Sequence, residues 1–473
     1  MTNSLPDAKL FRAYDIRGCA ETLLTPAAAR SIAGAFARRV ADTSERRIVL
    51  GRDGRLTSPT LHTVVRDTLV EAGLQVLDIG LVPTPVLYFA QQHLRCKNGL
   101  MITGSHNPAG DNGFKLCLDG EPFFGDALRA MRDEITAHPP KAPGGAITEH
   151  NLSTAYIDAV AKNIRLQRPL AIAIDCGNGA AGTVAGALYR ALGCEVTELY
   201  SEVDGHFPNH HPDPAVASNM AVLGETVTAN GLDLGLAFDG DGDRIGFLDE
   251  GGTRVTADRQ LMLFADHVLA HHPGAPVVFD VKCSRRLPAV VRAAGGVPVF
   301  CRTGHANLKR CVHTHNAPLA GELSGHTVFA DRWFAFDDAL YAGARLIELA
   351  AATPEPASTL FAPYPQDPST DELLLPVDGA NPHRITDDLI AASAFDDAEV
   401  FTLDGLRIEF PDGWGLVRAS NTTSSLVLRF EGDTHATLHR IRDRILSELR
   451  GVAPDLPIPD HIINADATQA IED

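Results

Sequence analysis

The chain has 473 residues, of which 45% are hydrophobic, and 41 basic against 60 acidic side chains give a formal net charge of −19. A chain of this length exceeds what one hydrophobic core organises, so we expect three or four domains. The acidic balance argues against nucleic acid as a partner, because phosphate backbones require concentrated basic charge. An anionic small molecule would need a locally basic site.

The amino terminus shows no basic segment followed by an apolar stretch, and no window of the chain reaches the 18 or more apolar residues of a membrane span. The eight cysteines are scattered without a C-x-x-C pair, which is typical of free thiols in a reducing compartment. The spacing Cys311-x-His313-x-His315 fits a solvated helix end better than a metal cluster. These features predict a cytoplasmic protein with no membrane partner.

A strand, helix and strand pattern occurs three times in the first three quarters of the chain. Such repeats predict three homologous α/β domains, with loops at the carboxyl ends of their strands. The expected elements of the three copies, in chain order, are 48–53, 58–71 and 73–77; 172–175, 182–192 and 193–196; 277–280, 287–294 and 295–299.

The last hundred residues break this pattern. The proline-rich segment 354–368 is interpreted as a linker, and a loosely held tail is expected beyond residue 459. Between them, alternating apolar residues predict antiparallel strands followed by an amphipathic helix, which together indicate a smaller α+β domain. The expected strands are 400–410, 415–418 and 425–430, and the expected helix is 433–450.

The segment Thr103-Gly104-Ser105-His106-Asn107-Pro108 follows a predicted strand end and offers one hydroxyl in a rigid loop. Gly104 is expected to supply unusual backbone angles beside Ser105. The serine-hydrolase pattern G-x-S-x-G fails here, because Thr103 and Asn107 stand where glycines are required. Acyl transfer therefore loses its main support.

Three aspartates alternate in Asp239-Gly240-Asp241-Gly242-Asp243-Arg244. An EF-hand loop requires glycine at its sixth position, where this chain has Arg244, and the flanking segments 232–238 and 245–248 fit strands. We therefore expect a hairpin turn that points three carboxylates at one Mg²⁺. A phosphorylated serine beside this cation is the simplest chemistry that unites the two segments, and it indicates phosphoryl transfer.

Two further segments suit the recognition of a sugar phosphate, although ordinary polar loops would explain either one equally well. Gly321-Glu322-Leu323-Ser324-Gly325-His326 offers groups that can hold sugar hydroxyls. Arg418-Ala419-Ser420-Asn421-Thr422-Thr423 offers a guanidinium, hydroxyls and an amide to a phosphate.

These motifs, together with Phe11 to Gly18 (FRAYDIRG), Asp111 to Lys115 (DNGFK) and Pro208 to Pro214 (PNHHPDP), make the chain resemble the α-D-phosphohexomutase superfamily, most closely its bacterial phosphomannomutase/phosphoglucomutase branch. The resemblance implies an α/β fold: three homologous α/β domains with mixed sheets and a C-terminal α+β domain around a central active-site cleft. The expected domains are 1–150 with the phosphoserine loop, 151–253 with the metal loop, 254–366 with the sugar-recognition loop and 367–473 with the phosphate-binding loop.

The resemblance also implies roles for single residues. Ser105 would carry the phosphoryl group and, with Asp239, Asp241 and Asp243, hold Mg²⁺. The expected catalytic side chains beside Ser105 are Arg244, Lys115, His106 and Arg17, and the general base is left open among His106, Lys115, Arg17 and His326. The expected substrate-binding residues are Tyr14, Arg17, Lys282, His305, Glu322, Ser324, His326, Arg418, Ser420, Asn421 and Thr422.

The implied reaction moves a phosphoryl group between C1 and C6 of mannose and glucose phosphates through a hexose 1,6-bisphosphate, which also acts as activator, and it supplies precursors for polysaccharides. A phosphoglucosamine mutase and a Mg²⁺-dependent sugar phosphatase are the alternatives, and a non-catalytic sugar-phosphate sensor is a third. Small-molecule sugar phosphates are the expected partners, and a monomer or weak dimer is the expected state.

Overall fold

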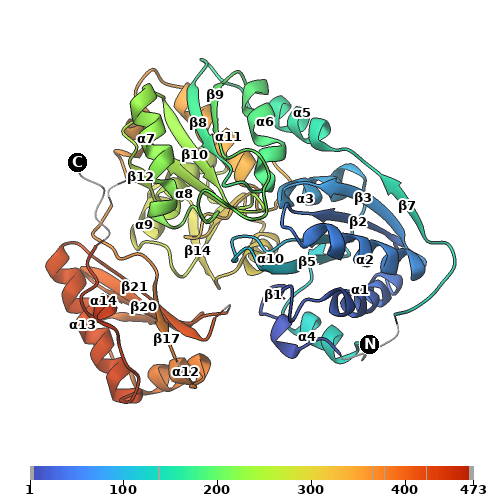
Figure 1. Ribbon diagram of the computed structural model, residues 1–473. Coiled ribbons are helices and arrows are strands. Elements are labelled where there is room, and N and C mark those ends of the chain that lie inside the picture. Colours follow the sequence, from blue (N-terminus) through green and yellow to red (C-terminus); the bar gives the residue numbers. More distant parts are fainter. Residues whose placement is uncertain (1–4, 137–138, 365, 378, 422, 468–473) are drawn as a thin grey trace.

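The computed structural model describes residues 5–136, 139–364, 366–377, 379–421 and 423–467. Its strands form four sheets, which follow one another along the chain. Figure 1 shows the first sheet in blue on one side, the C-terminal elements in red on the other, and the green and yellow elements between and above them. The predicted α/β architecture with mixed sheets is confirmed.

The first sheet has the order β1-β5-β4-β2-β3-β7, with β6 paired to β5. Its parallel strands β2, β3 and β4 end near the site, and helices cover both faces (Figure 1). The bounds are η1 Ala8–Leu10, β1 Ile16–Cys19, α1 Pro26–Ala41, β2 Arg47–Arg52, α2 Ser58–Glu71, β3 Gln75–Leu81, α3 Thr84–His93, β4 Gly99–Ile102, β5 Asp111–Leu118, β6 Glu121–Pro122, α4 Asp126–Asp133 and β7 Ala146–Glu149.

Helix α1 illustrates why these sequences fold locally as they do. The Thr25 hydroxyl accepts the Ala28 N–H, and Pro26 occupies the first turn, where a missing N–H is harmless. Ile32, Phe36 and Val40 then recur at every fourth position and are fully buried. The predicted helix at 58–71 has the same bounds as α2.

The second sheet has the order β12-β11-β10-β8-β9, in which β8 pairs in parallel with β9 and β10 while β10 and β11 form an antiparallel hairpin. The predicted helix 182–192 is divided into η2 and α6, because the backbone leaves helical geometry at Val184. The bounds are α5 Ser153–Asn163, β8 Ala171–Asp175, η2 Ala180–Thr183, α6 Ala185–Ala191, β9 Glu195–Leu199, η3 Ala217–Met220, α7 Ala221–Asn230, β10 Leu234–Phe238, β11 Ile245–Leu248 and β12 Arg254–Val255.

The third sheet has the order β14-β13-β15-β16, with only its last pair antiparallel. Its helix α11 also packs against β10 and β11 of the second sheet, and one hydrophobic core continues through the first three sheets. The bounds are α8 Ala257–Leu269, β13 Pro276–Asp280, α9 Arg286–Ala293, β14 Val297–Cys301, α10 His305–His315, β15 Leu319–Gly321, β16 Thr327–Phe329, α11 Ala339–Ala351 and η4 Ala357–Phe361.

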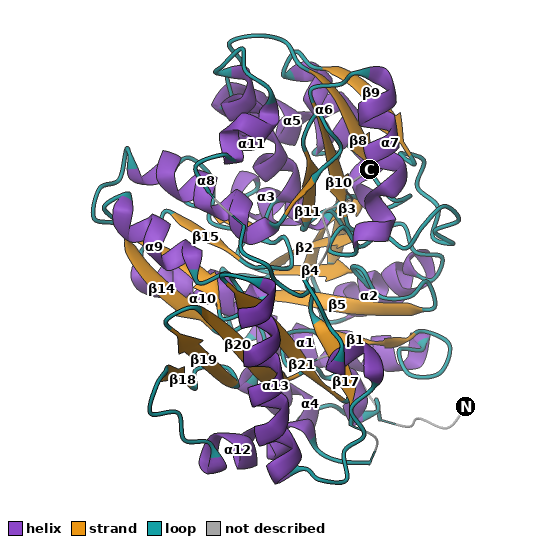
Figure 2. Ribbon diagram, turned by 90° about the vertical axis from the view of Figure 1, so that its left-hand side faces the viewer, coloured by secondary structure: helices purple, strands orange, loops and turns teal. Residues whose placement is uncertain are grey.

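The fourth sheet is antiparallel throughout, in the order β17-β21-β20-β19-β18, and α12 and α13 share its separate core. Figure 2 shows α13 lying across these strands. The predicted strand 400–410 is in fact the hairpin β18–β19. The bounds are β17 Leu373–Pro376, α12 Pro382–Ala392, β18 Glu399–Phe401, β19 Leu406–Phe410, β20 Gly413–Ala419, β21 Ser425–Gly432, α13 His435–Val452 and α14 Asp460–Ile463.

The described residues of the predicted linker and of the predicted tail are both packed against the rest of the molecule, so the expectation of a loosely held tail is wrong. The predicted linker contains η4, whose Phe361 is 1% exposed, and Ser358 of this segment donates two hydrogen bonds to Glu250. In the predicted tail, Ile462 of α14 is fully buried in the core of the fourth sheet. Apolar side chains hold both segments, which proline content alone does not reveal. No described helix is long and apolar enough to cross a membrane.

Candidate active site

Ser105 follows β4, and its backbone has a φ of +48°, a left-handed conformation that serine rarely adopts. The expectation that Gly104 supplies the unusual angles is therefore wrong. Gly104 is required for space instead, because a Cβ there would lie 2.4 Å from Nε of Arg55. Ser105 is buried, with an exposure of 2%.

Arg55 holds the serine loop from beneath, a role that the sequence analysis missed. Its guanidinium donates to the carbonyl oxygens of Ser105 at 2.7 Å, Asn107 at 2.6 Å, Pro108 at 2.6 Å and Asp111 at 2.8 Å. The loop therefore has its carbonyls satisfied by one rigid fork of donors. A signal was present, because Arg55 follows the predicted strand 48–53 at its carboxyl end, where α/β folds place their sites.

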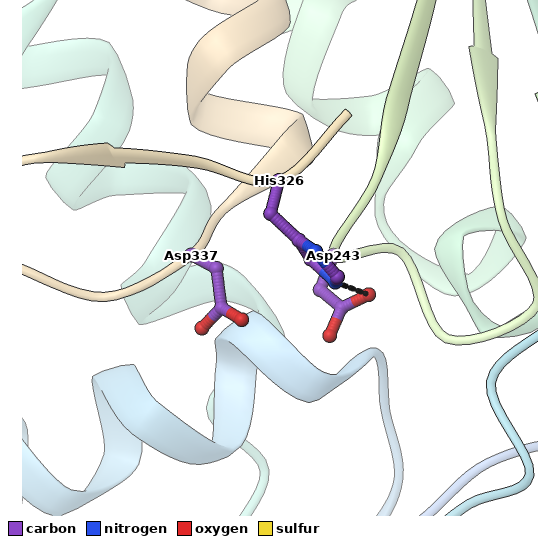
Figure 3. Close-up of side chains that lie close together, drawn as sticks. All are labelled: Asp243, His326 and Asp337. Carbon is purple, nitrogen blue, oxygen red and sulfur yellow. Dashed lines mark ion pairs between the residues drawn. The ribbon is translucent and has the colours of Figure 1, made fainter. Parts of the chain in front are cut away.

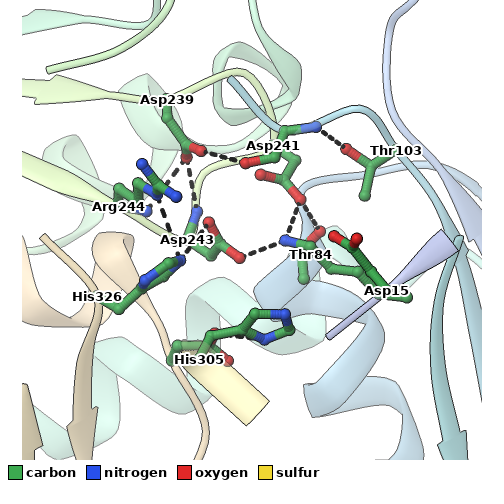
Figure 4. Close-up of polar contacts among 12 residues, drawn as sticks. Asp15, Thr84, Thr103, Asp239, Asp241, Asp243, Arg244, His305 and His326 are labelled. Carbon is green, nitrogen blue, oxygen red and sulfur yellow. Dashed lines mark hydrogen bonds and ion pairs between the residues drawn. The ribbon is translucent and has the colours of Figure 1, made fainter. Parts of the chain in front are cut away.

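The hairpin β10–β11 carries Asp239, Asp241 and Asp243 on the loop between its strands (Figure 4), and this aspartate loop lies against Ser105. Asp239, Asp241 and Asp243 are fully buried, and the Ser105 hydroxyl donates to Oδ2 of Asp239 at 2.9 Å. A Cβ on Gly240 would lie 2.4 Å from the carbonyl oxygen of Ser105, so glycine is needed for this close approach. The two loops singled out from the sequence thus meet, although 134 positions separate their contacting residues.

The three aspartates form a group that could hold a metal ion, because each offers an oxygen within 4.8 Å of the others. Oδ1 of Asp241 and Oδ1 of Asp243 are buried without a hydrogen bond in the described part of the chain. Burial and then the charges of Asp243 and Asp241 raise the pKa of Asp239 well above its usual range. A cation among these carboxylates would relieve that repulsion, and an all-oxygen set suits a hard cation such as Mg²⁺.

Two side chains outside the loop orient these carboxylates. Lys115 on β5 donates to Oδ2 of Asp241 at 2.6 Å and also to Oδ2 of Asp243. Burial would lower the pKa of Lys115, but the charges of Asp241 and Asp243 prevail and raise it, so its ammonium group stays charged. Thr84, at the start of α3, donates its hydroxyl to Asp241 Oδ2 at 2.5 Å and its N–H to the Asp241 carbonyl at 2.8 Å. Sequence reasoning missed Thr84.

The predicted sugar-recognition segment lies beside the aspartate loop. Glu322 accepts from His326 Nδ1 at 2.7 Å, and His326 Nε2 lies 3.3 Å from Asp243 Oδ1 (Figures 3 and 4). Burial would lower the pKa of His326, but Asp243 and Glu322 raise it to about 9. His326 is thus an imidazolium held between two carboxylates. Arg244 contacts its ring at 3.4 Å, and the Ser324 hydroxyl lies 3.2 Å from Nδ1.

Asp337 is a further buried carboxylate that the sequence analysis missed (Figure 3). It accepts from Lys309 at 2.8 Å and lies 3.5 Å from Nδ1 of His305, which begins α10. Burial, followed by the charge of Lys309, lowers the pKa of His305, so this imidazole stays neutral at pH 7. His305 and His326 lie close together with their ring centroids 5.7 Å apart, and they differ in charge.

On the other side of Ser105, His106 Nδ1 lies 3.1 Å from the serine hydroxyl. Burial and the nearby Arg244 lower the pKa of His106 well below its usual value, so this ring also stays neutral. Arg17 donates to Oδ1 of Asn107 at 2.7 Å and to Asp15 at 2.5 Å, which places its guanidinium against the serine loop.

The remaining predicted residues form a second cluster between the third and fourth sheets. Arg418 at the end of β20 donates to Asp404 at 3.1 Å, and Lys282 pairs with Glu372 at 2.9 Å. The Ser420 hydroxyl accepts from Thr423, and Asn421 contacts the hydroxyl of Tyr14. Thr422 lies outside the described residues.

Tyr14 links this second cluster to the first. A Cβ on Gly304 would lie 2.6 Å from the Tyr14 ring, and the Gly304 N–H donates to Glu322. Contacts therefore run from Asn421 through Tyr14 and Gly304 to Glu322 and His326. The structure brings segments from all four sheets into one connected polar region.

Comparisons with known proteins agree with this arrangement. Four family profiles match in the expected order: phosphoglucomutase/phosphomannomutase alpha/beta/alpha domain I at residues 8–140, domain II at 154–252, domain III at 256–366 and the C-terminal domain at 382–448. Together they cover most of the chain.

Individual relatives are similar over nearly their whole length. A phosphomannomutase/phosphoglucomutase of Pseudomonas syringae is 46% identical over 455 residues, 96% of this chain and 98% of that one. A phosphoglucomutase of Neisseria gonorrhoeae is 47% identical over 92% of this chain and 95% of its own. A crystal structure of a family protein from Burkholderia thailandensis superposes with a TM-score of 0.90 at 43% identity, over 96% of this chain and 100% of that one. The chain therefore belongs to the phosphoglucomutase/phosphomannomutase family.

Proposed function

We propose that this enzyme is a phosphohexomutase that moves a phosphoryl group between C1 and C6 of mannose and glucose phosphates. Relatives 46% and 47% identical bear the names phosphomannomutase/phosphoglucomutase and phosphoglucomutase. The observation that carries the proposal is the contact between the Ser105 hydroxyl and Asp239 at 2.9 Å, inside a trio of buried carboxylates. One hydroxyl beside a cation site is what a phosphoserine intermediate requires.

Asp239, Asp241, Asp243 and an oxygen carried by Ser105 would hold Mg²⁺, which when bound would polarise phosphorus and neutralise charge on the transferring group. Lys115 contributes a fixed positive charge to Asp241 and Asp243, so they keep their orientation before the cation arrives. Arg244, whose backbone N–H donates to Asp239 at 3.1 Å, begins β11 beside the same group. These charges are fixed before reaction, which is the arrangement that stabilises a phosphoryl transition state most effectively.

The attacking sugar hydroxyl must lose a proton to a general base. The sequence left four candidates for this base, and the protonation states of three of them now differ. A lowered pKa keeps His106 neutral and able to accept a proton, while a raised pKa keeps Lys115 and His326 charged. His305, which was predicted only as a substrate-binding residue, is also neutral. We assign the base to His305 and the role of charged donors to Lys115 and His326, since His106 already contacts Ser105.

The proposed intermediate is a hexose 1,6-bisphosphate, which must turn end for end so that its second phosphate faces Ser105. Glu322 and Ser324 would bind the sugar hydroxyls in either orientation. Arg418, Ser420, Asn421 and Thr422, with Lys282 and Tyr14, would hold the phosphate that is not reacting. The contact path from Asn421 through Tyr14 to Glu322 supports this division of the site.

The direct test is Ser105→Ala, assayed with glucose 1-phosphate and mannose 1-phosphate in the presence of catalytic bisphosphate. We expect turnover to fall by at least roughly 10⁴-fold, because no other described hydroxyl donates to Asp239, while substrate binding persists. Thr103→Ser is a matched control, since it keeps the hydroxyl that accepts the Ser105 N–H at 2.8 Å. Near-normal mutase activity of Ser105→Ala would remove serine from the mechanism.

The same assay separates the alternatives. Faster turnover of glucosamine 1-phosphate would make the enzyme a phosphoglucosamine mutase, and release of free phosphate in proportion to substrate would make it a phosphatase. The domain bounds at residues 150, 253 and 366, a cytoplasmic location, a monomeric or weakly dimeric state and a role in polysaccharide synthesis stay predictions from the sequence.

A further inference from the structure

Two cysteines that lie ten positions apart in the chain meet at the edge of the third sheet. Cys301 is the last residue of β14, and Cys311 lies in the middle of α10, which runs beside that strand (Figure 2). Their Sγ atoms are 2.8 Å apart. This distance is shorter than the roughly 3.5–4.0 Å that separates two non-bonded carbon atoms in van der Waals contact, although sulfur is the larger atom.

The surroundings of the pair favour reaction at one sulfur followed by the other. Cys301 is 2% exposed and lies in an apolar cluster with Leu308 and Val312, whereas Cys311 is only half-buried. The contact with Cys301 and the charge of Arg310 lower the pKa of Cys311, which favours its thiolate. A reagent in solution can therefore reach Cys311 and not Cys301.

We propose that Cys301 and Cys311 are a site of reversible oxidation, at which a low-molecular-weight disulfide converts the two thiols into an intramolecular disulfide. The Cys311 thiolate attacks one sulfur of the reagent and releases its other half as a thiol. Cys301 then loses its proton and attacks Sγ of Cys311, and the second half of the reagent leaves and takes up a proton to become a thiol. Two protein thiols and one reagent disulfide thus give one protein disulfide and two reagent thiols.

The required movement is small, because an S–S bond is about 2.05 Å long and the atoms need to approach by less than about 1 Å. The bond would nonetheless close a ring around the segment that carries site residues. Thr303 donates its N–H to Asp404 of the fourth sheet at 3.0 Å, Gly304 donates to Glu322, and His305 faces Asp337. Oxidation would enclose these three residues in a covalent loop and so restrict their movement.

The same helix also reaches the first sheet. The guanidinium of Arg310 lies 4.1 Å from the centre of the Phe124 ring, and His313 pairs with Glu121 of β6 at 2.9 Å. A covalent link in the middle of α10 would therefore restrain a helix that joins the first and third sheets and follows a segment bonded to the fourth. Because displacements of about 1 Å in positioning groups can lower rates by roughly 10²-fold, we expect the oxidised enzyme to be markedly less active.

The experiment exposes the reduced full-length protein to oxidised glutathione and follows mutase activity and the disulfide together. Trypsin cleaves after Arg302 and Arg310, so the two cysteines fall in separate peptides unless a disulfide joins them. We expect the joined peptides to appear as kcat/KM falls at least fivefold, and both changes to reverse with dithiothreitol. Mapping the peptides needs no activity, so the site is tested even if the proposed reaction is wrong.

Cys311→Ser and Cys301→Ser should keep their activity in oxidised glutathione, and Cys311→Ser, at a half-buried position, remains informative if the buried Cys301→Ser fails to fold. Cys19→Ser is the matched control, because Cys19 is also half-buried but makes no contact with the pair, and it should respond like the wild type. A stable glutathione adduct on Cys311 without the link would overturn the proposal. So would a linked pair with unchanged activity, or equal inactivation of both Ser variants.

Discussion

Ser105 owes its proposed reactivity to its setting, because a serine hydroxyl by itself is a weak nucleophile. Its left-handed backbone, the fork of Arg55 beneath it and the approach of Gly240 together aim the hydroxyl at Asp239. His106 and His305 stay neutral, while His326, held by two carboxylates, stays charged. At this scale, burial and neighbouring charges divide three similar imidazoles into different roles.

The neutral state of His305 predicts a pH dependence. Asp337, Lys309, Lys115 and His326 surround its ring, and its pKa is lowered below 6.5 chiefly by burial. As pH falls through that lowered pKa, the ring gains a proton and can no longer act as a base, so kcat/KM should fall about tenfold per pH unit. The kcat/KM of His305→Gln should be roughly 10²–10⁴-fold lower than that of the wild type, and its pH profile should lack this decline at low pH. If the variant showed the same decline at low pH, the general base would be His106 instead of His305.

Thr84 offers a second prediction at the residue scale. Its hydroxyl orients Asp241 from outside the aspartate loop, so Thr84→Val should weaken Mg²⁺ binding by roughly 10–100-fold. Titrating activity with Mg²⁺ measures this change, and it should appear as a higher requirement for the cation with little change in kcat at saturation. Thr84→Ser keeps the hydroxyl and should resemble the wild type. Equal Mg²⁺ requirements in the two variants would contradict the assignment.

At the scale of elements, the site is formed by loops at the ends of strands. The serine loop follows β4, the aspartate loop joins β10 to β11, and His305 begins the helix after β14. Buried apolar residues hold the strands and helices beside these loops, which gives the loops a rigid support. Arg55 connects the serine loop to β2, because it follows that strand and donates hydrogen bonds to four carbonyl oxygens of the loop.

Arg55→Lys should therefore impair the loop while leaving the strand intact. An ammonium group cannot replace a fork that bonds four carbonyls, so buried acceptors lose their donors. We expect the free energy of unfolding to fall by about 2–3 kcal/mol and kcat to fall by roughly 10²-fold. Urea unfolding and steady-state kinetics measure the two effects. Arg66→Lys on the exposed face of α2 is the control, and an Arg55→Lys variant as stable and active as this control would contradict the role.

The same scale shows what the sequence could and could not predict. Strong periodicity located β2, α2, β8, β13 and α13 to within a few residues, and the alternating aspartates indicated a buried cation site that the geometry supports. Periodicity does not reveal the roles of Arg55, Thr84 and Asp337, because their partners lie more than 25 positions away, and only Arg55 had a signal in its place after a predicted strand. The tail was misjudged for a similar reason, as Ile462 is buried by a core that only the folded chain creates.

At the scale of the whole molecule, buried side-chain hydrogen bonds hold the fourth sheet to the third among the described residues. Arg407 of β19 donates to the carbonyls of Val281 at 2.5 Å and Cys283 at 2.8 Å, and its guanidinium lies 3.7 Å from the Trp414 ring. Toward the first sheet, the structure shows the contact between Tyr14 and Asn421. The proposed turning of the bisphosphate needs a site that can open and close, and the fourth sheet, which has its own core, is the unit whose docking we expect to control that opening.

Arg407→Met tests this fastening. Removal of the guanidinium leaves buried carbonyls unpaired, so the free energy of unfolding should fall by about 2–4 kcal/mol. Calorimetry should show the C-terminal unit unfolding before the rest of the molecule. The control is Arg384→Met in the same unit, where an exposed i,i+4 pair with Asp388 should contribute almost nothing. Identical transitions in the two variants would contradict a role for Arg407 in docking.

The most direct test of the account is to follow one phosphoryl group through the enzyme by intact-mass and peptide mass spectrometry. Glucose 1,6-bisphosphate should add one phosphoryl group to Ser105 of the dephosphorylated protein, and glucose 6-phosphate should then remove it as bisphosphate. A phosphoryl group found on another residue, or one released from Ser105 only as inorganic phosphate when substrate is added, would contradict it.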